Sequence, residues 1–136
     1  MPPVLGILSA EMAGNLSTSG RIVLVATDLM RQSRVAEAAR ALGYAVAVAT
    51  TIDEAREALH ASAGAGAIVI LDLQAEGIPW RDVVTAAGSV PVIAFGQHTK
   101  PDILRAARAA GCRMAVPRSR LVEQLPQLIE KAKGAP

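Results

Sequence analysis

The sequence predicts a three-layer α/β fold, in which helices cover both faces of a doubly wound, five-stranded parallel sheet. Five short apolar segments alternate with five segments whose apolar residues recur at helical spacing. The connections between the segments are short, which favours parallel strands joined by right-handed crossovers. The third apolar segment, 67–72, is apolar on both faces up to its last residue, as expected for a strand in the middle of such a sheet.

The five predicted strands are rich in Val, Ile and Ala. They cover residues 21–27, 44–50, 67–72, 90–95 and 112–116. The expected strand order is 2-1-3-4-5, in which the winding direction changes between the first and third strands. The loops after Thr27 and Asp72 should therefore flank one crevice at the carboxyl edge of the sheet. The fourth and fifth strands should bring Gly96 and Arg118 to the same edge.

A helix is predicted after each strand. The five helices are expected at 29–42, 52 to about 64, 80–87, 102–110 and 121–133. Gly43 suits the position that ends the first helix, whose charged residues, including Arg31, fall mostly away from its apolar stripe. Thr51 and Glu54 have the spacing of a capping box at the start of the second helix. Pro126 predicts a kink in the last helix or a later start for it.

The N-terminal region differs from the rest. Residues 1–20 are expected to form a flexible arm or leader, because 15–20 is a polar stretch of small residues typical of a linker. Alternatively, the apolar segment 4–8 packs on the domain or on a second copy of the chain. The folded domain is expected to cover 21–134.

Composition limits the class of protein. The chain has 136 residues, enough for one domain with one core, and 51% are hydrophobic, which excludes disorder as its main state. Aromatic residues make up 2%, and 14 basic residues are scattered among 12 acidic ones, so nucleic-acid binding is not favoured. A single cysteine and two separated histidines do not suggest a disulfide or a zinc centre. Without a long apolar stretch or a basic leader, we expect a cytoplasmic protein with no membrane contact.

Asp72 is the strongest candidate for a functional residue. It follows the buried third strand directly, and open α/β sheets place their chemistry at the carboxyl ends of such strands. An aspartate in this place also commonly begins a turn or caps the next helix. The strand alone does not separate these two interpretations.

Several motifs, in order, make the chain resemble a known family. They are Leu42-Gly43-Tyr44, the aspartate after the third strand, the Val90-Pro91-Val92-Ile93 entry to the fourth strand, and Ala109-Ala110-Gly111 before the fifth. With these motifs, the stretch from 21 to about 133 resembles the receiver domain of bacterial two-component response regulators. The resemblance implies a flavodoxin-like fold. It also implies transfer of a phosphoryl group from a histidine kinase to an aspartate, assisted by Mg²⁺.

The resemblance assigns roles to four positions. Asp72 matches the phosphoacceptor, and Arg118 stands where the family has a Lys that contacts the phosphoryl group. Gly96 takes the place of a Thr or Ser, and Ala115 that of an aromatic residue that moves during signalling. Arg118 keeps the positive charge but is longer and planar, and could form a forked ion pair with Asp72.

The acidic pair that follows the first strand in the family is also missing. Ala26 and Thr27 stand at its two positions, and Asp28 lies one residue further on. A metal ion would therefore have only Asp28 and Asp72 as carboxylate ligands, a weak site for Mg²⁺.

Two functions follow from these departures. The first is a stand-alone, atypical receiver that acts as a protein–protein interaction module without phosphorylation, its pocket held in one state by an Asp72–Arg118 contact. Under this first interpretation, the protein is not expected to be an enzyme or to need a cofactor. The alternative is a phosphorylatable receiver, with Asp72 as nucleophile and Mg²⁺ at Asp28 and Asp72. A small-molecule binder at the same crevice, or an unrelated enzyme, remains open.

The expected partner in either case is another signalling protein, a histidine kinase or an output protein. The surface expected to bind it is formed by the fourth helix, fifth strand and fifth helix. A homodimer through this face is a further expectation.

Overall fold

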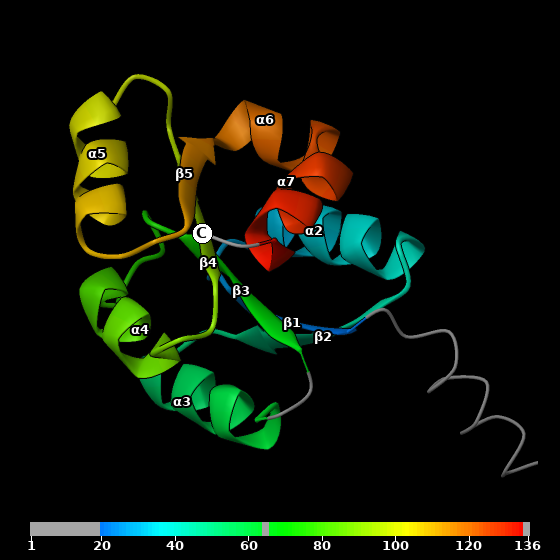
Figure 1. The fold of residues 1–136 in the computed structure, drawn as a ribbon. Helices are drawn as coiled ribbons and strands as arrows, with labels where there is room; N and C mark the ends of the chain where they lie inside the picture. Colours follow the sequence, from blue (N-terminus) through cyan, green and yellow to red (C-terminus); the bar gives the residue numbers. More distant parts are fainter. Residues whose placement is uncertain (1–19, 64–65, 135–136) are drawn as a thin grey trace, which may run out of the picture.

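The computed structural model describes residues 20–63 and 66–134. Five parallel strands form one sheet in the order β2-β1-β3-β4-β5, with helices on both faces (Figure 1). The predicted fold class and strand order are confirmed. The N-terminal arm is expected over residues 1–20. Residues 1–19 lie outside the described residues, and Gly20 is the first residue of the first strand.

The elements follow the predicted alternation. The strands are β1 (Gly20–Val25), β2 (Tyr44–Ala49), β3 (Ala67–Asp72), β4 (Val92–Gly96) and β5 (Met114–Pro117). The helices are α2 (Leu29–Ala41), α3 (Ile52–Ala61), α4 (Trp80–Ala87), α5 (Pro101–Ala109), α6 (Arg118–Glu123) and α7 (Leu125–Lys133). Within the described part of the chain, no helix is both long and apolar enough to cross a membrane.

The largest difference from the prediction lies at the C-terminal end. The single helix expected over 121–133 is two helices, α6 and α7, and the first of them begins at Arg118. Pro126 stands in the first turn of α7, where a proline is tolerated because the first backbone N–H groups of a helix have no intrahelical partner. Of the two effects predicted for Pro126, the later start is therefore the one observed.

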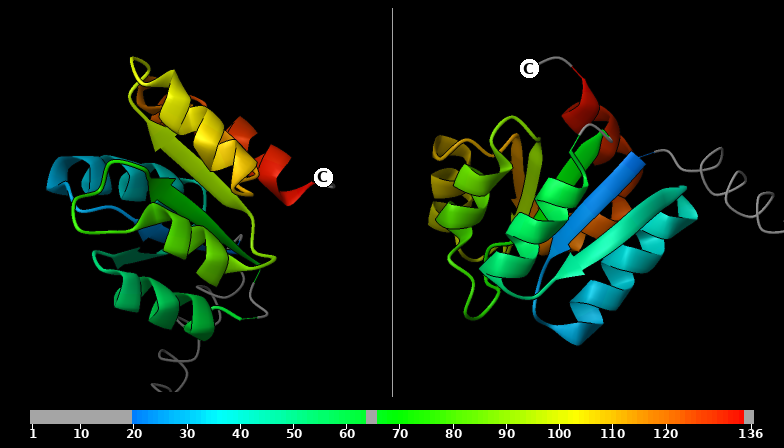
Figure 2. Two further views of the ribbon diagram at one scale, coloured as in Figure 1. Left: turned by 90° about the vertical axis from the view of Figure 1, so that its left-hand side faces the viewer. Right: turned by 90° about the horizontal axis from the view of Figure 1, so that it is seen from below.

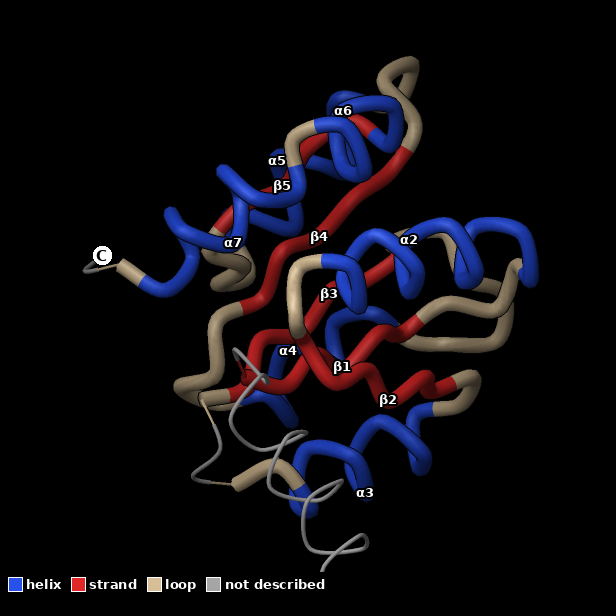
Figure 3. The backbone as a smooth tube through the Cα atoms, turned by 90° about the vertical axis from the view of Figure 1, so that its right-hand side faces the viewer, coloured by secondary structure: helices blue, strands red, loops and turns tan. Residues whose placement is uncertain are grey.

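The sheet separates two hydrophobic layers. Alternate residues of β1 point to opposite faces, with Ile22 and Leu24 on the side of α2, α6 and α7, and Val23 and Val25 on the side of α3, α4 and α5. These two groups of helices lie on opposite faces of the sheet (Figure 2). The tube view likewise places α2 and α3 on opposite sides of β1 and β2 (Figure 3). This arrangement leaves the carboxyl edge of the sheet open to the loops that follow the strands.

Local sequence signals explain how the helices begin and end. Thr51 Oγ1 accepts a hydrogen bond from the Glu54 N–H at 3.0 Å, and the Glu54 carboxylate accepts one from the Thr50 N–H at 2.7 Å. The hydrogen bonds from Thr50 lower the pKa of the Glu54 carboxyl, so the cap is held by an ionised group. Gly43 follows α2 with φ at 92°, a left-handed conformation that glycine adopts without strain.

The core on the α3, α4 and α5 side encloses the sole cysteine. Cys112 is 7% exposed, and burial raises the pKa of its thiol from 9.0 to about 11. The neutral thiol is thus favoured in the folded state. The stability that this preference contributes is complete below about pH 9 and is lost as the pH rises to about 11.

We expect Cys112 to resist thiol-directed reagents near pH 8, because the reactive thiolate is disfavoured and the sulfur is shielded. The measurement is the rate of reaction with an aromatic disulfide reagent, with and without urea. The reaction should be fast only in urea. A fast reaction in the folded protein would show that the thiol is accessible.

Candidate functional site

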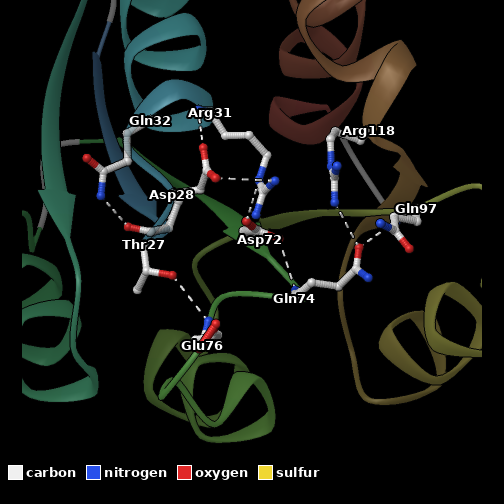
Figure 4. Close-up of polar contacts among 10 residues, drawn as sticks. Thr27, Asp28, Arg31, Gln32, Asp72, Gln74, Glu76, Gln97 and Arg118 are labelled. Atoms are coloured by element: carbon white, nitrogen blue, oxygen red, sulfur yellow. Dashed lines mark hydrogen bonds and ion pairs between the residues drawn. The ribbon is translucent and has the colours of Figure 1, made fainter.

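The carboxylate of Asp72 lies at the carboxyl edge of the central strand and is completely buried, with a side-chain exposure of 0%. One oxygen, Oδ2, accepts a hydrogen bond from Arg31 Nε at 3.0 Å. The other, Oδ1, accepts one from the Gln74 backbone N–H at 2.9 Å (Figure 4). Both oxygens are therefore engaged, one of them in an ion pair.

Arg31 is held in place by the start of α2. The preceding loop ends at Asp28, which caps the helix by accepting a hydrogen bond from the Arg31 N–H at 2.9 Å. The other Asp28 oxygen lies 3.8 Å from Arg31 Nη1. The Arg31 guanidinium thus stands between two carboxylates, those of Asp28 and Asp72 (Figure 4). The hydrogen bond from the Arg31 N–H, with a further contribution from the guanidinium charge, lowers the pKa of the Asp28 carboxyl.

Arg118 has a different partner from the one predicted. Its Nη2 donates to Gln74 Oε1 at 3.2 Å, and the same oxygen accepts from the Gln97 N–H at 2.8 Å. Gln74 therefore joins the loop after β3 to the loop after β4 and the start of α6 (Figure 4). The predicted Asp72–Arg118 contact is wrong, because the side chain of Gln74 receives Arg118 while Arg31 reaches Asp72 from the first turn of α2.

The remaining predicted residues lie around the same edge. Ala26 is fully buried, and its carbonyl accepts a hydrogen bond from Gln32 Nε2 at 2.6 Å. Thr27 Oγ1 accepts from the Glu76 N–H at 3.2 Å, which ties the loop after β1 to the loop after β3. At Gly96, an added Cβ would lie 3.6 Å from Gln74 Oε1, an ordinary contact, so space does not require glycine there.

No pattern in the sequence indicates the role of Arg31 directly, since this residue falls off the apolar stripe of its helix. The signal that could have found it is the cap. By accepting a hydrogen bond from its N–H, Asp28 holds Arg31 in the first turn of α2, from which the arginine side chain reaches Asp72.

The donor set at this edge does not fit Mg²⁺. This ion prefers six oxygen ligands in octahedral geometry. Asp28 and Asp72 approach a common group, but that group is the guanidinium of Arg31, and both oxygens of Asp72 accept hydrogen bonds. Over residues 20–63 and 66–134, no cluster of three or more His, Cys, Asp or Glu side chains could hold a metal ion.

The fold is that of receiver domains in solved structures. One is the receiver domain of NtrX from Brucella abortus, 19% identical over 82% of this chain and 97% of that chain, with a TM-score of 0.73. A response regulator receiver domain protein from Clostridium thermocellum is 15% identical over 84% and 94%, with a TM-score of 0.74. The N-terminal domain of a response regulator/sensory box/GGDEF three-domain protein from Carboxydothermus hydrogenoformans is 21% identical over 83% and 93%, with a TM-score of 0.69.

Sequence comparison adds no relative to these structures. No protein-family model matches the chain. No curated protein sequence matches it either. The identities to the solved structures are low, so the likeness establishes the fold, and the site has to be argued from its own residues.

We expect Arg31→Ala to lower the free energy of unfolding by about 3 kcal/mol, because it leaves the buried Asp72 carboxylate without its ionic partner. Asp72→Asn should cost less, since it removes the charge and keeps the hydrogen-bonding capacity. In the double variant, the loss should be smaller than the sum of the two single losses. Urea unfolding followed by circular dichroism measures all three.

The matched control for this series is Arg118→Ala, which removes a guanidinium bound to a neutral amide. It should cost less than Arg31→Ala. A larger loss for Arg118→Ala, or strictly additive losses in the double variant, would contradict the pairing of Arg31 with Asp72.

We also expect weak Mg²⁺ binding, because Arg31 supplies the positive charge between the two carboxylates. Trp80 begins α4 after the loop that follows Asp72, so its fluorescence is a suitable probe. No saturable change should occur in the submillimolar range, whereas Arg31→Met should strengthen the response. A submillimolar titration of the wild-type protein that disappears in Asp72→Asn would contradict this expectation.

Proposed function

We propose that this protein is a receiver-like signalling module that acts through contact with another protein and does not depend on phosphorylation of Asp72. The observation that carries the proposal is the ion pair between Arg31 and the fully buried carboxylate of Asp72. The receiver fold supports the class of function, a signalling module. The pocket supports the independence from phosphorylation.

Phosphoryl transfer to an aspartate needs a free carboxylate oxygen in line with the leaving group, and a cation that neutralises the developing charge. At Asp72, Oδ2 is bound to Arg31 and Oδ1 to the Gln74 N–H. Each oxygen thus has one lone pair engaged, and because the side chain is 0% exposed, neither oxygen is open to an incoming phosphoryl donor unless Arg31 moves. The guanidinium is part of the chain and, unlike a metal ion, does not exchange with solvent, so the charges of the pocket are fixed.

The positions that couple the pocket to the surface in the family also lack the necessary groups. Gly96 has no hydroxyl, and Ala115 is a buried residue with no ring to rotate. The Ala115 carbonyl accepts a hydrogen bond from Arg108 Nη1 at 2.8 Å, which fixes β5 to α5. A modification shifts an equilibrium only through its different affinity for two states. With these groups missing, we infer a partner surface that stays in one state.

The proposed partner surface consists of α5, β5 and the fifth predicted helix, which in the structure is the pair α6 and α7. The side chain of Arg105 on α5 is 64% exposed, so its charge is available at the surface. It also pairs with Asp102, one turn earlier in the same helix. Arg108 has a structural role through its bond to β5, so it is a poor probe of partner binding. The proposed partner is a histidine kinase or an output protein, and a homodimer through the same face is part of the proposal.

The alternative is a phosphorylatable receiver with Asp72 as the nucleophile. One observation favours it. Asp28 and Asp72 both contact the same guanidinium, at 3.8 and 3.0 Å. If the Arg31 side chain rotated away, the two carboxylates would face a common space.

Treatment with acetyl phosphate and Mg²⁺, followed by intact-mass measurement, separates the two functions. The wild-type protein should gain no phosphoryl group, because the Asp72 carboxylate is buried and paired with Arg31. Arg31→Met tests whether the arginine is the obstacle, and Asp72→Asn is the control for the site of modification. A stoichiometric phosphoryl group on the wild-type protein that is absent from Asp72→Asn would establish the alternative.

A further inference from the structure

A cavity of about 520 Å³ opens beside the Asp72 site, between α2, the loop after β4 and the start of α6. Its lining combines three arginines, Arg31, Arg34 and Arg118, with apolar side chains that include Val35, Phe95 and Leu121. Asp72 is not part of the lining. The cavity is therefore a separate space, but it shares Arg31, Gln97 and Arg118 with the site described above.

The positive charge of the lining is only partly balanced. Arg31 is paired with Asp72 and Asp28, but Arg118 donates to a neutral amide, that of Gln74. No hydrogen bond or ion pair joins the Arg34 side chain to another residue of the described chain, and no acidic residue lines the cavity. Two guanidinium groups thus face this space without a carboxylate partner, which favours an anionic ligand.

Arg118 gives an independent indication. Its Nε is buried and has no hydrogen-bond partner among the described residues, while its Nη2 is held by Gln74. Buried donors of a charged group are nearly always satisfied, because an unsatisfied one is costly. Since Arg118 lines the cavity, an acceptor bound there would lie next to this guanidinium.

The apolar part of the lining defines the rest of the ligand. Val35, Phe95 and Leu121 belong to the core on the α2 side of the sheet and are nearly fully buried. The partly buried Val122 is the more accessible apolar residue of the lining. A volume of about 520 Å³ lies within the range of small-molecule sites. Guanidinium groups bind phosphate through two parallel hydrogen bonds and also stack on flat groups.

We propose that this cavity binds a small phosphate ester whose organic part is flat and partly apolar, of the nucleotide class. Arg34 and Arg118 would hold the phosphate, and the organic part would lie against the apolar lining. This inference goes beyond the proposed signalling function and does not depend on whether Asp72 is phosphorylated.

Isothermal titration calorimetry on the full chain tests the ligand class with three probes. ADP carries both a flat ring and phosphates, pyrophosphate carries only the charge, and adenosine only the ring. ADP should bind most tightly, with a dissociation constant on the order of 100 µM, and its affinity should fall as salt is added. If ADP binds no more tightly than adenosine, or no more tightly than pyrophosphate, the proposal is overturned.

Arg34→Gln locates the binding. Arg34 is exposed and has no partner in the described chain, so the variant should keep the melting temperature of the wild-type protein while the affinity for ADP falls about tenfold. Arg40→Gln is the matched control, because Arg40 is an exposed arginine of the same helix outside the cavity. It should change the affinity less than twofold. Equal losses in both variants would show a general charge effect and overturn the proposed site.

Discussion

The burial of the Asp72 carboxylate is the constraint on which the site depends. An ionised group removed from water needs compensating partners, and here one is a backbone N–H and the other the guanidinium of Arg31. Arg31 can reach Asp72 because Asp28 ends the preceding loop and caps α2. The cap, the first turn of the helix and the tip of the central strand thus form one electrostatic unit.

This unit has a chain of alternating charges, with a guanidinium between two carboxylates. A metal ion in that position could enter and leave with the conditions, whereas a side chain is always present at the same effective concentration. The pocket therefore contains a permanent positive charge, that of Arg31, where a bound metal ion would supply one that comes and goes. That permanent charge is the physical reason for proposing a module that stays in one state.

The pairing of Arg31 with Asp72 also determines the partner of Arg118. With Asp72 already paired, Arg118 bonds to Gln74 and keeps a buried Nε without a partner beside the cavity. Arg31 belongs to both spaces, since it binds Asp72 and lines the cavity. Arg118 also takes part in both, because it bonds to Gln74 and lines the cavity, so two arginines join the two spaces.

Much of the fold was determined by the sequence alone. Periodicity and turn signals suffice for the five strands, their order and the capping box at Thr51, because these features depend on local propensity and on the rules of parallel sheets. The position of Asp72 at the edge of the central strand follows from the same pattern. The boundary between α6 and α7 does not follow from the sequence pattern, because a proline in a helical pattern allows either a kink or a new start.

Only the tertiary structure decided which arginine pairs with Asp72. Arg31 lies 41 positions away in sequence and Arg118 lies 46 away, and both are long enough to approach the same edge. The choice depends on where the first turn of α2 stands above the sheet, and on Gln74, whose side chain receives Arg118. Side-chain pairing across elements is set by distances of a few ångströms, which a one-dimensional pattern of residues does not contain.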